Sequence, residues 1–236
     1  MKLMLDKLKQ DLQKLKNPKK AKVLQGFFKT GRGQYGEGDI FLGIVVSLQR
    51  KISRKYQTLK LDDLKKLLST NIHEYRLTAL FILVNKYEKA KEKEKAEIFD
   101  FYLKNTKGIN NWDLVDLSAP KIVGDYLLDK SEKRKILYQF ANSDDLWKKR
   151  IAVLATYTFI KADKFEDILK IAEILLNDRH DLIHKAVGWM LRELGKKNQK
   201  IEEDFLKKYY RAMPRTMLRY AIERFDKEKR NFYLGR

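Results

Sequence analysis

The chain has 236 residues, of which 44% are hydrophobic and 11% aromatic, so it can bury a sizeable core and is not a disordered sequence. Its 52 Lys and Arg against 32 Asp and Glu give a formal net charge of +20, which favours a polyanion such as nucleic acid as partner, although lysines that only solubilise helix faces would give the same count. The absence of cysteine excludes disulfides, thiolate metal sites and a cysteine nucleophile, and it fits a reducing cytoplasm.

The N-terminal segment predicts an amphipathic helix. Residues 1–16, MKLMLDKLKQDLQKLK, carry a charge every few positions. They therefore lack the continuous apolar core of a signal peptide or a membrane span. The sequence predicts a soluble, cytoplasmic protein without a membrane partner.

Glycines concentrate in the next segment. Five of the eleven glycines lie between Gly26 and Gly38, within GFFKTGRGQYGEGDIF. This composition predicts one long irregular loop between helices. A loop of this length usually has a function, and the alternative is a flexible connector. Without a strand before it and a helix after it, its glycines are weak evidence for a phosphate-binding loop.

The remaining chain predicts an all-α fold. Apolar residues recur at helical spacing in residues 61–69 (LDDLKKLLS), 164–176 (KFEDILKIAEILL) and 201–210 (IEEDFLKKYY). No strand-like alternation is convincing, and only three prolines interrupt the pattern.

A repeat becomes visible when EYRLTALFIL, NNWDLVDLSA, KKRIAVLATY, IHKAVGWMLR and MLRYAIERFD are aligned. The alignment places these residues in one register: Arg76, Trp112, Arg150, Lys185 and Arg219. They lie 36, 38, 35 and 34 residues apart, and each interval holds a second apolar segment after a turn signal. The pattern predicts helical hairpins that stack into a curved α-solenoid of HEAT-like repeats, in a single domain over residues 1–236.

The register also predicts a surface. It is basic at four of five positions, so helices that line an inner curve would form a basic stripe there. One helical turn later the same face reads Leu80, Asp116, Leu154, Trp189 and Glu223. We therefore expect one group of side chains to converge on adjacent helices: Trp112, Asp116, Arg150, Lys185 and Trp189.

Four segments carry a resemblance to a known family. They are residues 27–44 (FFKTGRGQYGEGDIFLGI), 110–116 (NNWDLVD), 145–150 (DLWKKR) and 184–196 (HKAVGWMLRELGK). Together with their spacing they resemble the AlkD-type family of alkylation-repair DNA glycosylases over nearly the whole chain. The resemblance implies a HEAT-like solenoid whose basic concave face cradles duplex DNA containing alkylated bases.

By matching motifs, the resemblance implies Asp116 as the catalytic carboxylate, flanked by Trp112 and Trp189. It implies Arg150 as a contact to the DNA backbone and an additional aromatic contact at Phe27 or Phe28. This chain has Phe where some members carry Tyr, which argues against a hydroxyl-dependent role there.

The basic register adds Arg76, Lys185 and Arg219 as DNA contacts. No cofactor and no metal are expected, and we expect a monomer.

The chemistry of the predicted residues agrees with this assignment. Alkylation at N3 or N7 makes a purine cationic, so the base can leave as a neutral molecule while positive charge develops on the deoxyribose. A fixed carboxylate such as Asp116 would stabilise that oxocarbenium ion and orient water. The indole faces of Trp112 and Trp189 would favour the same cation. The resemblance further implies that the base is not inserted into a pocket.

Each of these residues also has a structural interpretation. Either tryptophan could be core packing, and Asp116 could form an ion pair with Arg150 or Lys185. Arg150 and Lys185 could also be solvated surface charges. Asp113 is expected to stabilise a helix N-terminus. Accordingly, a non-catalytic HEAT-like nucleic-acid-binding module and a protein scaffold are the alternative functions.

The histidines do not suggest a metal site. His180 and His184 lie four residues apart, so both could face one metal on a helix, but no third ligand accompanies them.

Overall fold

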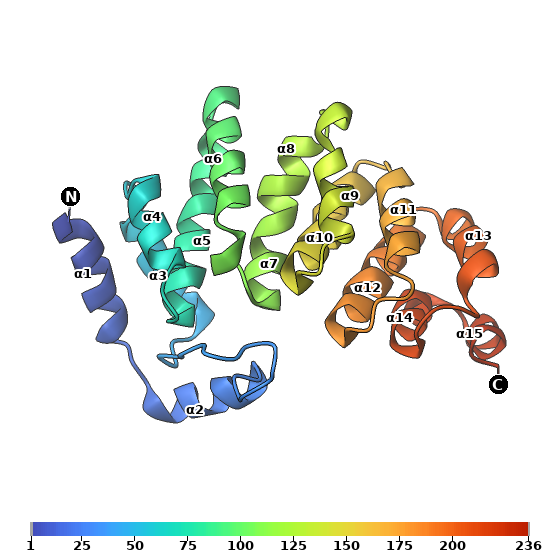
Figure 1. Ribbon diagram of the computed structural model, residues 1–236, viewed down its shortest axis with the longest axis horizontal. Coiled ribbons are helices and arrows are strands. Elements are labelled where there is room, and N and C mark those ends of the chain that lie inside the picture. The colour runs from blue at the N-terminus through green and yellow to red at the C-terminus, as the bar shows by residue number, and fades with distance from the viewer. Residues whose placement is uncertain (1, 236) are drawn as a thin grey trace. The chain divides into compact units, whose positions relative to one another are not determined.

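The computed structural model describes residues 2–235, and within that range it is built from helices, without a β-strand (Figure 1). The all-α prediction is confirmed. The chain divides into two compact units, Met1–Ser118 and Ala119–Arg236. None of the helices between residues 2 and 235 is long and apolar enough to cross a membrane.

The first unit is organised around α5 (His73–Lys89). Its other elements are α1 (Lys2–Gln13), α2 (Pro18–Phe27), α3 (Val46–Lys55), α4 (Leu61–Leu68), α6 (Glu92–Lys104), the 3-10 turn η1 (Thr106–Gly108) and the start of α7 (Trp112–Ala119). α1, α3, α4 and α6 all pack against α5. Every residue from 73 to 84 is buried as a result, so α5 is the central helix of this core.

The segment between α2 and α3 follows the surface of α5 and contains no α-helix. Gly26 lies within α2, so the irregular segment spans residues 28–45 and is shifted from the predicted residues 26–41. Ile40 pairs with Ile72 in an isolated parallel bridge. Gly43 has φ +84°, and a Cβ there would lie 2.1 Å from the carbonyl oxygen of Asn17. This close backbone approach requires glycine.

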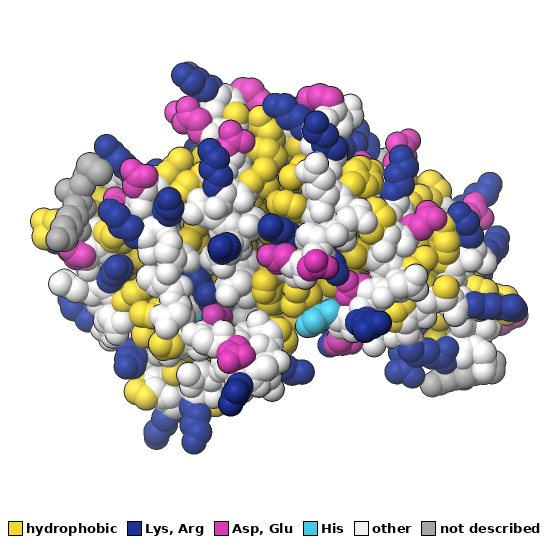
Figure 2. Space-filling view, viewed as in Figure 1, with side chains coloured by type: hydrophobic (Ala, Val, Ile, Leu, Met, Phe, Trp, Pro, Cys, Tyr) yellow, Lys and Arg dark blue, Asp and Glu magenta, His cyan; other side chains and the backbone are white. Residues whose placement is uncertain are grey.

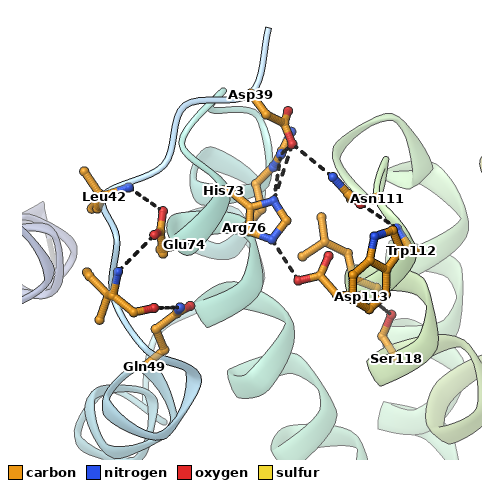
Figure 3. Close-up of polar contacts among 12 residues, drawn as sticks. Asp39, Leu42, Gln49, His73, Glu74, Arg76, Asn111, Trp112, Asp113 and Ser118 are labelled. Atoms are coloured by element: carbon orange, nitrogen blue, oxygen red, sulfur yellow. Dashed lines mark hydrogen bonds and ion pairs between the residues drawn. The ribbon is translucent and has the colours of Figure 1, made fainter. Parts of the chain in front are cut away.

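A buried carboxylate holds the same segment. Glu74 in α5 accepts hydrogen bonds from the backbone N–H groups of Leu42 (2.8 Å), Gly43 (2.8 Å) and Ile44 (3.2 Å). Figure 3 shows the bond from Leu42. These donors would otherwise be buried without a partner, which costs free energy. The segment is therefore anchored to α5, and this attachment argues against the alternative that it is a flexible connector.

The second unit shows the hairpin repeat most clearly. Its helices are α8 (Asp125–Leu127), α9 (Lys135–Ala141), α10 (Leu146–Lys161), α11 (Glu166–Ile174), α12 (Asp181–Lys197), α13 (Gln199–Tyr209), α14 (Arg215–Ala221) and α15 (Lys227–Leu234), with the shorter turns η2 (Pro120–Gly124), η3 (Ser131–Lys133) and η4 (Ile222–Arg224). η2, α10, α12 and α14 pack in succession, while α9 and α11 pack beside α10. The predicted α-solenoid class, in which alternate helices of a repeat stack on one another, is thus confirmed.

Glycine permits the closest of these contacts. A Cβ on Gly188 of α12 would lie 2.4 Å from the carbonyl oxygen of Met217 in α14. A Cβ on Gly124 of η2 would lie 2.3 Å from the carbonyl oxygen of Ala155 in α10. The spacing between successive helices therefore depends on the missing side chains at these two positions.

Candidate functional site

The candidate site of the first unit is built on α7, which begins at Trp112. Asn111, fully buried, precedes the helix, and its side-chain oxygen accepts the backbone N–H of Trp112 at 2.8 Å. Trp112 and Asp116 are both half-buried and lie one turn apart on this helix. The two side chains therefore lie on the same face of α7, as the spacing of four residues predicts.

The charge of Asp116 acts on the buried hydroxyl group of Tyr102 in α6. Burial raises the pKa of Tyr102, the hydrogen bond to Ser118 opposes that shift, and the charge of Asp116 adds to it. The hydroxyl groups of Tyr102 and Ser118 are 2.9 Å apart. The negative charge of Asp116 therefore helps to keep the Tyr102 hydroxyl group protonated.

Trp112 is the first ring of a stack of aromatic side chains. Phe28 stacks on Trp112 with ring centroids 5.1 Å apart and an angle of 10° between the rings. Phe41 stacks on Phe28 at 5.0 Å, and the ring of His73 stacks on Phe41 at 4.4 Å. We call Trp112, Phe28, Phe41 and His73 the aromatic stack. It connects the start of α7 to the start of α5.

The two neighbouring phenylalanines have different surroundings. Phe28 is buried (7% exposed), whereas Phe27 is 62% exposed. Phe27 meets Trp112 edge-on with centroids 5.9 Å apart. Of the two positions left open by the sequence, Phe27 alone presents its ring to solvent beside Trp112. The Phe28 assignment as a DNA contact is replaced by a packing role, because Trp112 and Phe41 cover its ring.

A polar network runs alongside the aromatic stack (Figure 3). His73 Nε2 lies 2.8 Å from Asp113 Oδ2, and His73 Nδ1 lies 3.4 Å from Asp39 Oδ2. The Arg76 guanidinium donates to the same Asp39 oxygen, and Asn111 approaches it at 3.5 Å. We call His73, Asp39, Arg76, Asn111 and Asp113 the buried network. No pattern in the sequence predicted it.

Both central groups of this network favour their charged forms. Burial lowers the pKa of His73, but the Asp113 and Asp39 carboxylates outweigh burial and raise it above its ordinary value. Burial raises the pKa of Asp39, but His73 and Arg76 outweigh it and hold that pKa below its ordinary value. Opposite charges at hydrogen-bonding distance explain both directions. Asp113, expected only to stabilise the start of a helix, is also the partner of His73.

The predicted residues of the second unit lie on α10, α12 and α14. Arg150 on α10 is buried (5% exposed), and its Nη1 donates to the carbonyl oxygen of Leu182 at 2.7 Å. Lys185 on α12 pairs with Asp181 at 2.6 Å. Trp189, one turn further along α12, donates from Nε1 to Glu193 at 3.1 Å and lies 6.3 Å from the ring of Tyr157. Arg219 on α14 is exposed.

The expected basic stripe needs correction. Arg76 is 3% exposed and forms an ion pair with Asp39, and Arg150 is nearly as buried. These two positions of the register point into helix packing, so the register does not form one exposed row of cations. Arg76 is therefore reassigned from DNA contact to the buried network. The convergence of Trp112 and Asp116 with Arg150, Lys185 and Trp189 stays a prediction.

Exposed cations occur elsewhere in the first unit. Lys19, Lys20 and Lys22 of α2 are exposed on the helix that ends at Phe27. Figure 2 shows Lys and Arg side chains over the visible faces of both units, with Asp and Glu interspersed. The lysines of α2 were not singled out from the sequence, because a Lys-rich helix start is ordinary in a chain with this composition.

The histidines of α12 bond to the backbone. His180 Nδ1 accepts the N–H of Leu182 at 3.1 Å, and His184 Nε2 lies 2.6 Å from the carbonyl oxygen of Asp178. Across residues 2–235, no group of three or more His, Cys, Asp or Glu side chains is arranged to hold a metal ion.

A model of the DNA alkylation repair enzyme family matches residues 8–225. The chain belongs to this family. A solved structure, a predicted DNA alkylation repair enzyme from Enterococcus faecalis, superposes with a TM-score of 0.70 at 19% identity, and the match covers 90% of this chain and 97% of that one. This likeness supports the shared helical fold. No curated protein matches the sequence.

Proposed function

We propose that this DNA alkylation repair enzyme is a monofunctional glycosylase that hydrolyses the N-glycosidic bond of cationic alkylated purines in duplex DNA. The observation that supports this best is the placement of Asp116 one turn from Trp112, on a helix whose start is fixed by the aromatic stack and the buried network. The products are the free base and an abasic site.

The chemical step needs little acid catalysis. The C1′–N bond breaks with its electron pair moving to the positively charged base, which leaves as a neutral purine. Asp116 stabilises the oxocarbenium ion that forms and orients water toward C1′, and the proton released by that water passes to solvent. Trp112 and Trp189 pack against the sugar, where the negative π-faces favour the developing cation.

DNA binding would use the exposed cations. Arg219 in the second unit and the lysines of α2 in the first are exposed and can neutralise phosphates. Lys185 is half-buried and would have to exchange its ion pair with Asp181 for a phosphate. Phe27 offers an exposed ring beside Trp112. Arg150 is the weaker candidate among the predicted DNA contacts, because its guanidinium already donates to Leu182. We propose that the protein acts as a monomer in the cytoplasm.

The test is release of methylated bases. Asp116→Asn keeps the size of the side chain but removes the charge that opposes the oxocarbenium ion, so single-turnover release of 7-methylguanine should fall about 10²- to 10⁴-fold. Affinity for duplex should hold or rise, because the repulsion between Asp116 and phosphates disappears.

Asp100→Asn, at an exposed position of α6, is the matched control and should release base at the wild-type rate. Normal release by Asp116→Asn would reject the catalytic role of Asp116. Duplex binding without release by the wild type would favour a non-catalytic DNA-binding module.

A further inference from the structure

The His73 ring is held at both nitrogens and on one face. Its nitrogens meet Asp113 and Asp39, and its face stacks on Phe41. The side chain is 2% exposed. A histidine so enclosed has little freedom to reorient, so its protonation state determines which hydrogen bonds it can keep.

We propose that His73 is doubly protonated at neutral pH and, through Asp113, is the positioning residue that sets α7 for base release. The second half of this inference rests on the proposed glycosylase function. The first half concerns the buried network alone.

Charge balance supports the second proton. Asp39 and Asp113 bring two negative charges to the buried network and Arg76 brings one positive charge. These three are the charged groups within 3.5 Å of the ring nitrogens, and with them an imidazolium makes the sum zero, whereas a neutral ring leaves one carboxylate uncompensated, which is costly in a desolvated place. The two carboxylates also accept from both ring nitrogens only when both carry hydrogen. Arg76 Nη2 lies 3.5 Å from Nδ1, farther than it lies from Asp39.

His73 reaches α7 along two routes. The direct route is the bond to Asp113, which occupies the first turn of α7 between Trp112 and Asp116. The second route is the aromatic stack, which continues through Phe41 and Phe28 to the indole of Trp112. A shift of the His73 ring therefore moves both the first turn of α7, through Asp113, and the indole of Trp112.

The end of α5 that carries His73 is itself immobilised. The N–H of His73 donates to the carbonyl oxygen of Ile40 at 2.9 Å. The adjacent Glu74 holds the backbone of residues 42–44. The backbone of His73 is therefore held in place by the segment between α2 and α3, so its ring can fix the position of Asp113.

Loss of the proton would disturb this arrangement at higher pH. The charged groups in contact with His73 are Asp39 from the segment between α2 and α3, Asp113 from α7, and Arg76 from its own helix. Glu74 and Lys20 line the same pocket. Asp39 and Asp113 raise the pKa of the imidazole, and Arg76 opposes them. The charged form therefore persists above the ordinary value of 6.5 and disappears as pH rises through the higher value in the fold.

The first experiment measures the protonation state directly. The chain contains three histidines, so long-range ¹H–¹⁵N spectra of the imidazole rings are simple, and the signal missing from His73→Gln identifies the ring. We expect the His73 nitrogens to keep the shifts of the doubly protonated ring to higher pH than those of His180, whose pKa burial lowers. A His73 ring that is neutral at about pH 7 would overturn the proposal.

The second experiment measures positioning. His73→Gln should lower the rate of the chemical step roughly 10- to 100-fold while leaving duplex affinity about unchanged, because the catalytic groups are present but misplaced. As pH rises above 6.5 and through the raised pKa of His73, the wild-type rate should fall with loss of the proton, and the variant rate should lack that fall. Lys164→Gln removes one positive charge at a surface ion pair of the second unit and is the matched control.

A double variant separates charge from shape. His73→Gln with Asp113→Asn restores the zero sum of the buried network, so it should recover folded stability relative to His73→Gln alone. Hydrogen exchange of α7 amides should accelerate in His73→Gln and slow again in the double variant. Wild-type release and unchanged exchange in His73→Gln would overturn the positioning role.

Failure of the proposed function gives a different pattern. A wild-type protein that releases no base would reject the glycosylase, while the imidazole spectra and the exchange of α7 would still decide whether His73 is charged and holds that helix. The two failures are therefore distinguishable.

Discussion

Phe27 and Phe28 are adjacent in the sequence, yet the fold gives them opposite surroundings. Helix α2 ends at Phe27, and the chain then turns so that Phe28 enters the aromatic stack while Phe27 stays exposed. Helical periodicity predicted neither placement, because the turn between them is set by packing against Trp112 and Phe41.

This difference predicts opposite outcomes for two alanine variants. Phe28→Ala should destabilise the protein by about 3–5 kcal/mol, because it removes a buried ring from between its stacking partners. Phe27→Ala should leave the free energy of unfolding close to wild type and reduce base release. Urea unfolding and single-turnover release measure the two effects. A strongly destabilised Phe27→Ala would place this ring in the core.

Glu202 on α13 is a buried carboxyl outside the proposed chemistry. Burial raises its pKa to about 8 from the ordinary value of 4.5, Glu203 adds to the shift, and Arg192 opposes it. The folded protein therefore holds a proton that the unfolded chain releases. This contribution to stability is fully present below pH 4.5 and is lost as pH rises toward 8.

Glu202→Gln should remove that pH dependence. Between these two pH values the wild type should lose up to about 1.4 kcal/mol of unfolding free energy per pH unit through this group, and the variant should not. The variant should consequently be the more stable protein at pH 8.5. Glu132→Gln, at an exposed position of η3, is the control and should keep the pH dependence of the wild type. Parallel stability curves for wild type and Glu202→Gln would contradict the raised pKa.

At the scale of elements, the sequence predicted most helices but not what fixes them. Hydrophobic spacing located α4, α11 and α13, because each buries one face along its length. The repeat alignment located α5, α10, α12 and α14. The buried network could not be predicted in this way. His73 lies 34 residues from Asp39 and 40 from Asp113, and no periodic pattern connects residues across such intervals. The stacking of rings that join α2, α5 and α7 escaped prediction for the same reason.

The segment between α2 and α3 depends on one carboxylate. Glu74→Gln should cost about 2 kcal/mol of unfolding free energy, because neutral amide oxygen accepts less strongly and its NH₂ group faces a backbone donor. Hydrogen exchange of residues 42–44 should accelerate, and base release should fall because Phe41 leaves the aromatic stack. Glu97→Gln at an exposed position of α6 should change none of these. Unchanged exchange in Glu74→Gln would show that Glu74 is not the anchor.

At the scale of the whole molecule, the net charge of +20 predicts strong salt dependence of duplex binding. The register of basic residues was wrong as a continuous stripe, since burial removes Arg76 and Arg150 from the surface. Composition could predict the partner class but not which cations are exposed, because helix packing decides that.

The lysines of α2 test where that charge acts. Replacement of Lys19, Lys20 and Lys22 by Gln should lower the slope of log affinity against log salt by about 0.9 for each DNA phosphate that these lysines neutralise in the wild type. The control replaces three exposed lysines with the same change in net charge: Lys89, Lys91 and Lys93. Equal slopes for both triple variants would mean that α2 contributes only through net charge.

The indole of Trp112 has one face occupied by Phe28, and Phe27 meets the ring edge-on. Phe28 covers one face with the rings nearly parallel, 10° apart. A deoxyribose that packs on Trp112, as we propose, therefore has to meet the face opposite Phe28, so we expect the protein to bind a lesion in one orientation. The protein must turn end for end to reach a lesion in the complementary strand. Footprints around a single lesion should accordingly be asymmetric, with the same 5′-to-3′ offset on whichever strand carries the damage.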